Sequence, residues 1–280
     1  MKIGIRLHDT APGSLRERLH FARVQGFCCA HVALSKVLDD FVMEDAPEKL
    51  NRDCAARVLQ DFRDTGMDCA VLGCYLNLAD PNAERRAKTQ EIYRAHLRFA
   101  ALTGADVVGT ETYANPDSVF SEPAARSEDA FRLFTESLKT VVRYAEEEDV
   151  ILAVEPVYHH IISTPERAER MLEAVPSDHL QIILDAVNLI GPRTTNQVYD
   201  VIEDAIHRLG DRVRILHMKD FILLQNGEIR SCACGLGSMR YERLLAFAAE
   251  RDLPIILEDT VPANAEEARM HLERFSGGVR

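Results

Sequence analysis

The sequence of 280 residues predicts a closed (β/α)8 barrel in which the whole chain, residues 1–280, forms one domain. Short apolar runs alternate with amphipathic stretches of about 12–20 residues, which is the pattern of repeated βα units. Eight such units follow one another along the chain. No Pro-, Gly- or Ser-rich linker and no change in composition separates them, so we expect one barrel and not two domains.

The expected strands are short apolar runs, and they cover residues 2–6, 30–33, 68–73, 107–111, 150–155, 182–185, 214–217 and 255–258. The expected helices cover residues 14–25, 47–65, 82–103, 127–148, 164–174, 196–209, 241–251 and 263–275. Ser127 and Thr164 precede two of these helices as N-caps, and Pro165 takes the first helical position, where its missing N–H costs nothing. Glycines that end helices before a strand stand at positions 26, 66, 104 and 210.

A doubly wound open sheet is the alternative fold for alternating βα units. Such a sheet normally has fewer strands, and a dinucleotide-binding version carries GxGxxG directly after its first strand. Here the first strand leads into HDTAPGS at residues 8–14, which lacks this pattern. The closed barrel is therefore the preferred interpretation.

Charge and composition limit the partners. The formal net charge of −12 repels a phosphate backbone and no basic patch offsets it, so we expect no nucleic-acid partner. No stretch approaches the roughly 20 apolar residues of a membrane helix, and the N-terminus runs into a strand without a secretory apolar region. We therefore expect a soluble, cytoplasmic protein without a membrane partner. Cys232 and Cys234 form a CxC pair without two further soft ligands nearby, and we interpret the seven cysteines as reduced thiols.

Five expected strands end in a residue that can bind a metal or transfer a proton: Glu111, Glu155, Asp185, His217 and Glu258. In a closed barrel the C-terminal ends of all strands meet on one face, which brings these residues together. Burying an unpaired carboxylate costs several kcal/mol, and acids that crowd on one rim repel each other. A divalent cation bound by four of them, Glu155, Asp185, His217 and Glu258, would remove both costs.

Three carboxylates and one imidazole make a ligand set that is rich in oxygen. Such a set suits Mn²⁺, Mg²⁺ or Co²⁺, with Zn²⁺ as an alternative, and we expect one divalent ion with Mn²⁺ as the first choice. Taken singly, a strand-end glutamate is equally well explained by an ion pair with Lys219, and His217 by a core histidine. Four such residues at the ends of four strands are better explained by a metal site.

Five short segments stand out between Val150 and Thr260. They are VEP at 154–156, LDAVN at 184–188, HMKD at 217–220, GLGSM at 235–239 and LED at 257–259. In this order and spacing they resemble the xylose-isomerase-like TIM barrel superfamily, which contains sugar (phosphate) isomerases and epimerases related to D-tagatose 3-epimerase and endonuclease IV. The resemblance extends over essentially the whole chain in its order of elements.

The resemblance implies that Glu155, Asp185, His217 and Glu258 are the metal ligands. It also implies that Glu155 and Glu258 act as the acid–base pair on opposite sides of a small sugar substrate. The metal would bind a ketone oxygen and a neighbouring hydroxyl, acidify the adjacent C–H and stabilise an enediolate. One glutamate would remove the proton, and the other would return it to a neighbouring atom or to the opposite face.

The chain departs from the family pattern in two places. Members often have Asp-x-x-His at the sixth strand, whereas here Asn188 follows Asp185; an asparagine can hydrogen-bond a hydroxyl of the substrate but is a poor metal ligand. The arginine that many epimerases place after the seventh-strand histidine is not evident, and HMKD supplies Lys219 and Asp220 instead. We expect Lys219 to bind an anionic or enolate group or to neutralise the acidic rim, and Asp220 to contact substrate or to orient His217 or Lys219.

Loops on the same rim supply the remaining expected substrate contacts, which are His8 after the first strand, Glu111 at the end of the fourth and His160 after the fifth. His159 is expected to be exposed. The other histidines are interpreted as structural residues on helices or on other surfaces of the barrel: His20, His31, His96, His179, His207 and His271.

We therefore expect a metal-dependent isomerase or epimerase of a small polyhydroxylated carbonyl compound, with a sugar as its partner and a homodimer or homotetramer as its assembly. A lyase or dehydratase that expels a β-substituent from the same enediolate is an alternative. A nuclease of the same fold would need three metals and a basic groove, which Asn188 and the net charge disfavour. A non-catalytic sugar-binding barrel is disfavoured because all expected ligands and both acid–base glutamates are present.

Overall fold

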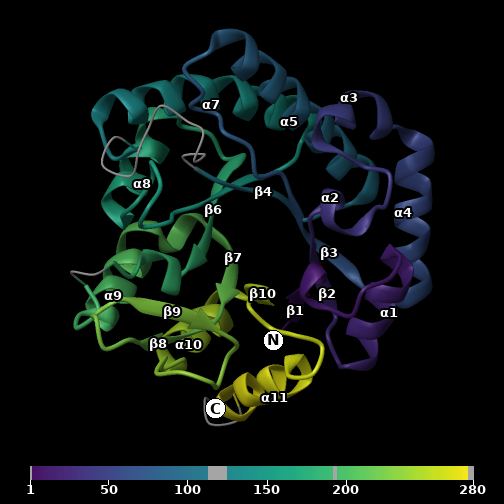
Figure 1. The fold of residues 1–280 in the computed structure, drawn as a ribbon. Helices are drawn as coiled ribbons and strands as arrows, with labels where there is room; N and C mark the ends of the chain where they lie inside the picture. The colour runs from purple at the N-terminus through teal and green to yellow at the C-terminus, as the bar shows by residue number, and fades with distance from the viewer. Residues whose placement is uncertain (1, 113–124, 192–193, 277–280) are drawn as a thin grey trace.

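A computed structural model describes residues 2–112, 125–191 and 194–276 of the chain. Eight parallel strands form a closed barrel, and the last strand pairs with the first (Figure 1). In barrel order the strands are β1 (Ile3–Arg6), β2 (Cys29–Val32), β3 (Asp68–Gly73), β4 (Val107–Glu111), β5 (Leu152–Glu155), β6 (Leu180–Asp185), β7 (Val213–Met218) and β10 (Ile255–Leu257). The predicted (β/α)8 barrel is confirmed.

Helices surround the barrel, as Figure 1 shows. The long ones are α1 (Leu15–Val24), α4 (Arg52–Thr65), α5 (Ala83–Thr103), α7 (Glu128–Glu148), α8 (Pro165–Ala174), α9 (Val198–Leu209), α10 (Glu242–Arg251) and α11 (Ala265–Ser276). Each overlaps one expected helix. None of the described helices is both long and apolar enough to cross a bilayer.

The helix expected over 47–65 is divided into α3 (Ala46–Lys49) and α4. The break lies at Asn51, whose extended backbone (φ −99°, ψ 178°) cannot continue a helix. Its side-chain oxygen accepts hydrogen bonds from the amides of Asp53 and Cys54, so it caps the N-terminus of α4. The prediction of one continuous helix was wrong because Asn51 forms a local cap.

Helix ends follow the expected glycine pattern with one exception. Gly66 and Gly104 have φ values of 65° and 70° and end α4 and α5 in the left-handed region. Gly210, expected to act in the same way, keeps right-handed helical angles and begins a short 3₁₀ turn. Asp149 and Asp252 take the left-handed position after α7 and α10.

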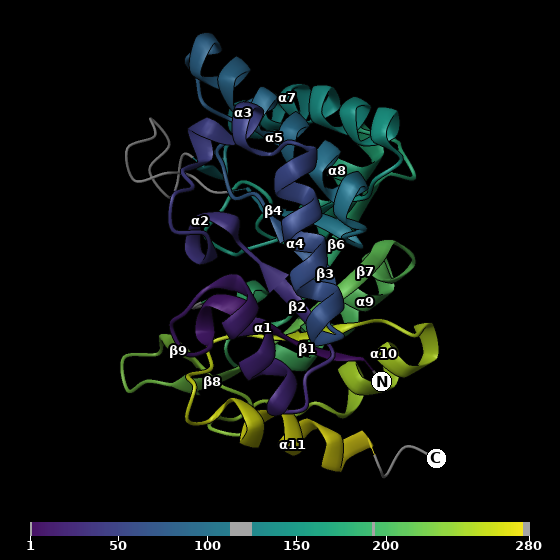
Figure 2. The ribbon, with the colours of Figure 1, turned by 90° about the vertical axis from the view of Figure 1, so that its right-hand side faces the viewer.

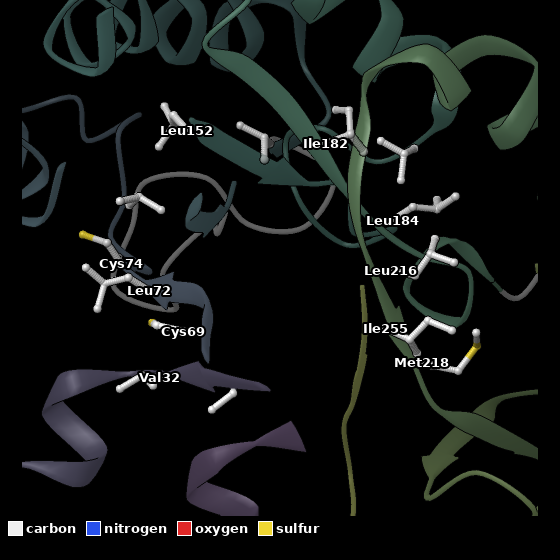
Figure 3. Close-up of a cluster of buried hydrophobic side chains, with 14 of the residues drawn as sticks. Val32, Cys69, Leu72, Cys74, Leu152, Ile182, Leu184, Leu216, Met218 and Ile255 are labelled. Carbon is white, nitrogen blue, oxygen red and sulfur yellow. The ribbon is translucent and has the colours of Figure 1, made fainter. Parts of the chain in front are cut away.

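Two apolar layers cover the two faces of each strand. One layer contains residues from strands and helices, and Figure 3 shows Leu152, Ile182, Leu184 and Leu216 as part of it. The other layer is drawn from seven of the barrel strands and contains no helix residue, so it fills the inside of the barrel. Because side chains alternate along a strand, an inward apolar residue places the residue two positions later inward as well.

A hairpin that the sequence did not predict follows β7. It pairs β8 (Asp220–Leu223) with β9 (Ile229–Cys232) in antiparallel fashion. Figure 2 shows this hairpin on the same side of the barrel as the short helix α2 (Leu34–Val37), away from the N-terminus. The hairpin and α2 therefore both lie on the side where the strands have their C-terminal ends.

Candidate metal centre and substrate pocket

Strand alternation explains why four distant residues meet inside the barrel. Ala153, Ile183, Ile215 and Ile256 belong to the inner apolar layer. The residues two positions later are the four predicted metal ligands Glu155, Asp185, His217 and Glu258. Three of them lie in β5, β6 and β7. Glu258 directly follows β10, which ends at Leu257, one residue earlier than the strand expected over 255–258.

The structure brings these four side chains into one compact cluster. Each offers one ligand atom, and the four atoms lie within 4.8 Å of one another. His217 Nδ1 lies 2.9 Å from Glu155 Oε2 and 3.2 Å from Glu258 Oε1. All four residues are buried, with exposed fractions from 1% to 5%. Three carboxylates that lie close together and are shielded from solvent repel one another, so they need a positive charge among them.

Lys219 supplies part of that charge. Its Nζ lies 3.1 Å from Asp185 Oδ2 and 3.2 Å from Glu258 Oε2, and the side chain is buried. Burial lowers the pKa of Lys219, but the neighbouring carboxylates of Asp185 and Glu258 outweigh it and hold the pKa above its usual value. Of the two roles expected for Lys219, the structure shows the one that neutralises the acidic rim.

The carboxylic acids and the imidazole shift one another's pKa values. Burial raises the pKa of Glu258, but the charges of His217, Lys219 and Arg6 outweigh burial and hold this pKa far below its ordinary value. Burial also raises the pKa of Asp185, to about 6, against the opposing effect of Lys219. For His217, burial lowers the pKa, but Glu155 and Glu258 outweigh it and raise the pKa to about 9.

The donor atoms fit a divalent cation. His217 Nδ1 makes no well-directed hydrogen bond within the described part of the chain, although two carboxylate oxygens lie within 3.2 Å of it. Asp185 is held by the amides of Val187 and Asn188, which both donate to Oδ1 and leave Oδ2 on the side of the cluster. Oxygen-rich sets with one imidazole bind Mn²⁺, Mg²⁺, Co²⁺ or Zn²⁺.

The remaining metal-capable group in the described ranges shares two of these residues. It consists of His31, His217 and Glu258. Neither Cys232 nor Cys234 belongs to such a group among the described residues, and both thiols are free. The metal-capable side chains of the described residues therefore form one centre.

A cavity of about 400 Å³ opens beside the cluster. Its volume falls within the roughly 300–1,000 Å³ of small-molecule sites. Its wall includes two of the expected substrate-binding residues, His8 and Glu111, together with Glu258. Apart from Glu258, the lining residues belong to the first half of the chain, between β1 and the end of β4.

One more of the expected contacts, His160, lies beside Glu111 at the edge of this region. Glu111 ends β4 and lies 3.6 Å from the Nδ1 atom of His160. Burial, and then the charges of Glu155 and Glu258, raise the pKa of Glu111 to about 8. Burial lowers the pKa of His160 to about 4, which favours the neutral imidazole.

Asn188 contacts a predicted metal ligand, Glu155. Its Nδ2 donates a 2.6 Å hydrogen bond to Glu155 Oε1, and its own position follows from the turn that Asp185 Oδ1 caps. The side chain therefore orients Glu155, in the position where family members often have histidine. His159 is exposed, as expected.

The contacts that the structure gives Asp220 differ from those expected with the substrate, His217 or Lys219. Its buried carboxylate accepts five hydrogen bonds: from the amides of Phe221, Gly235, Gly237 and Met239 and from the hydroxyl of Tyr241. These donors begin the hairpin and form the GLGSM segment. Asp220 therefore holds the loop together, because both of its carboxylate oxygens accept hydrogen bonds from the loop.

His31 was misassigned as a structural residue away from the site. It stands two positions after the inward residue Cys29, so it also points inward, and it is 1% exposed. Its Nε2 shares a 2.9 Å hydrogen bond with the hydroxyl of Tyr75, and both residues line the cavity. Arg6, which also lines the cavity, lies 3.3 Å from Glu258 Oε2. Strand alternation was the available signal for His31 and Arg6.

The other histidines lie outside the cluster and this cavity, in agreement with the prediction. Four are on helices and one precedes β6: His20, His96, His207, His271 and His179.

A model of the family described as "Xylose isomerase-like TIM barrel" matches residues 27–275. The chain belongs to this family. A comparison with curated proteins finds no match. The family match spans the metal cluster and most of the cavity wall, and it confirms the resemblance that the VEP, LDAVN, HMKD and LED segments indicated.

Solved structures share the family fold at low sequence identity. A 3-keto-D-glucoside 4-epimerase from E. coli is 19% identical, with a TM-score of 0.76 and coverage of 99% of each chain. A D-tagatose 3-epimerase-like protein is 16% identical, with a TM-score of 0.77 and coverage of 100% of this chain and 98% of its own. An IOLI protein with a bound zinc atom is 16% identical, with a TM-score of 0.73 and the same coverage.

Proposed function

We propose that this family member is a metal-dependent isomerase or epimerase of a small polyhydroxylated carbonyl compound, with a sugar as substrate. The observation that carries the proposal is the position of Glu155 and Glu258. Both approach His217 Nδ1, yet they come from strands that β6 and β7 separate in the barrel. Two carboxyl groups on two sides of one buried centre suit proton transfer between the two faces of a substrate.

Glu155, Asp185, His217 and Glu258 would hold one divalent ion, Mn²⁺ as first choice and Mg²⁺, Co²⁺ or Zn²⁺ as alternatives. Such an ion supplies Lewis-acid chemistry at a carbonyl oxygen. The epimerase names of two similar structures and the zinc atom in the third agree with this proposal. A cytoplasmic location and a dimeric or tetrameric assembly complete it.

The surroundings of the two glutamates divide their roles. Lys219 and Arg6 contact Glu258 Oε2 and favour its ionised form, so Glu258 starts as the base that takes a proton from the carbon next to the carbonyl. Glu155, oriented by Asn188, delivers a proton to the opposite face or to the neighbouring atom. The cavity wall beside Glu258 admits the substrate, and burial of the cluster excludes water from the transfer.

Hydrogen exchange at the substrate tests the proposal directly. The Mn²⁺-loaded enzyme is incubated in D₂O with a panel of ketoses and aldoses, and deuterium at carbon is followed by NMR. We expect incorporation with the wild type and a loss of at least 100-fold in Glu155→Gln and Glu258→Gln. Glu136→Gln, on the exposed side of α7, is the matched control.

Thermal melting checks that each glutamine variant is folded. Full exchange in both active-site variants would show that these glutamates do not move protons. Exchange accompanied by loss of a β-substituent from the substrate would identify a lyase in place of an isomerase.

A further inference from the structure

Polar side chains line the cavity at both its inner and its outer end. At the inner end lie Glu258 and the buried His31, next to the metal cluster. At the outer end lies Lys36, an exposed residue of α2. Figure 2 shows α2 on the side of the barrel where the strands end, above β2. A substrate in this cavity therefore meets carboxylates at one end and an ammonium group at the other.

Lys36 differs from every other lysine of this acidic chain. The other five each lie within 3.2 Å of a carboxylate oxygen, in the pairs Lys2–Asp68, Lys49–Asp45, Lys88–Glu84, Lys139–Glu136 and Lys219–Asp185. Within residues 2–112, 125–191 and 194–276, no carboxylate lies within ion-pair distance of Lys36. An unpaired ammonium group on a cavity wall, in a chain of net charge −12, is available to a ligand.

Arg6, the other cationic residue of the cavity wall, is already ion-paired. Arg6 lies 3.1 Å from Asp9, 3.3 Å from Glu258 and 2.9 Å from Asp259. Three carboxylates more than neutralise one guanidinium group. Lys36 thus provides the one uncompensated positive charge among the described residues that line the cavity.

His8 is a further polar residue of the cavity wall. It lines the cavity, and its Nδ1 is buried without a hydrogen-bond partner in the described part of the chain. Burial, and then the charge of Arg6, lowers the pKa of His8 to about 4, with a smaller contribution from Lys36. The imidazole is therefore neutral and offers a hydrogen bond to a hydroxyl or an oxyanion, and Ser35 adds a hydroxyl beside Lys36.

We propose that the outer end, formed by Lys36, Ser35 and His8, binds a single negative charge on the substrate, and that the substrate is a sugar acid with a carboxylate remote from its reacting carbonyl. The assignment rests on the proposed function in treating the cavity as the substrate site. One uncompensated cation matches one carboxylate, and it lies at the end of the cavity away from Glu258 and the proposed metal site. The charge pattern thus fixes the direction in which the substrate enters.

Binding without turnover tests this inference. D-gluconate and D-glucitol share a six-carbon polyol chain and differ at C1, and neither has a carbonyl group to react. Calorimetric titration of the Mn²⁺-loaded enzyme is expected to give a Kd for D-gluconate about tenfold below that for D-glucitol. The difference should disappear in Lys36→Met and persist in Lys36→Arg. Lys88→Met, on the exposed face of α5, should leave it unchanged.

Three results would overturn the inference. Equal affinity for D-glucitol and D-gluconate in the wild type would remove the anion site. A preference for D-gluconate that survives Lys36→Met would place the carboxylate on the metal. Tighter binding of D-glucitol 6-phosphate than of D-gluconate would assign the site to phosphate. Each readout is a Kd, so the outcome is independent of the exchange experiment that tests the proposed reaction.

Discussion

The imidazole rings of His31 and His217 stack with their centroids 5.2 Å apart and their planes inclined by 17°, although β1 and β10 separate their strands in the barrel. Tyr75 holds the other side of His31 through its hydroxyl. Gly73 leaves the space for this pair, because a Cβ there would lie 2.6 Å from the Tyr75 ring and 2.9 Å from His31 Nε2. Packing from the first half of the barrel therefore supports His217, a predicted metal ligand of the second half.

Removal of the Tyr75 hydroxyl should destabilise the protein. Tyr75→Phe leaves the Nε2 atom of the fully buried His31 without its hydrogen bond, which costs about 1–3 kcal/mol. The free energy of unfolding in urea measures the loss. Tyr144→Phe, which loses a hydroxyl on the helix surface, should change it by less than about 0.5 kcal/mol. Equal effects of the two changes would mean that the hydrogen bond to His31 contributes nothing specific.

Asp185→Asn should separate metal binding from folding. The amide keeps an oxygen where Val187 and Asn188 donate, but it removes a negative charge from the cluster. We expect Mn²⁺ affinity, measured by calorimetry, to fall at least tenfold, or about 1.4 kcal/mol. EDTA should lower the melting temperature of the wild type and have a smaller effect on the variant.

The control for this change is Asp178→Asn, a side chain that is almost fully exposed. It should bind Mn²⁺ like the wild type. Unchanged affinity in Asp185→Asn would remove Asp185 from the ligand set.

Asp220→Ala should be among the most damaging single changes outside the metal cluster. It leaves four backbone amides and the Tyr241 hydroxyl without their shared acceptor in a buried position, and we expect a loss of more than about 3 kcal/mol. Urea unfolding measures it. Asp211→Ala, which removes an exposed partner of Arg251, should cost less than about 0.5 kcal/mol. A mild effect of Asp220→Ala would contradict its role as the anchor of the loop.

The free energy of unfolding should decrease as the pH is lowered, because His96 on α5 is buried in its neutral form. Burial lowers the pKa of His96 to about 4, against the opposing hydrogen bond to the Ile92 carbonyl. The unfolded chain binds this proton near pH 6.5, so stability is lost as pH falls from about 6.5 towards 4. Between pH 7 and 5 the loss amounts to about 2 kcal/mol.

Urea unfolding of His96→Leu at both pH values measures this contribution. The variant should lose about 2 kcal/mol less than the wild type over the interval. The exposed His207→Leu should follow the wild type. If His96→Leu lost as much stability as the wild type, the protonation of His96 would not be coupled to folding.

The strands and their polar ends were predictable because one physical rule governs both. An inward apolar residue, such as Ile215, sets the direction of the residue two positions later, His217. The same rule applied to Cys29 would have placed His31 inside the barrel. The surroundings of Asp220 were not predictable, since its five donors come from a hairpin and a loop whose path depends on tertiary packing. The break at Asn51 was not predictable, because a single asparagine in a helical pattern can either continue the helix or cap a new one.

The predicted metal ligands come from β5 onward, whereas the cavity wall comes, except for Glu258, from β1 to β4 and the loops that follow them. In the proposed function, the chemistry and the recognition of the substrate therefore depend on different halves of the chain. If the proposed function holds, substitutions before residue 112 should alter which molecule is bound, while the residues proposed to hold the ion keep their places. A new selectivity can be sought by exchanging the first half-barrel alone. Glu258 would then be kept, because it belongs both to the cavity wall and to the proposed metal site.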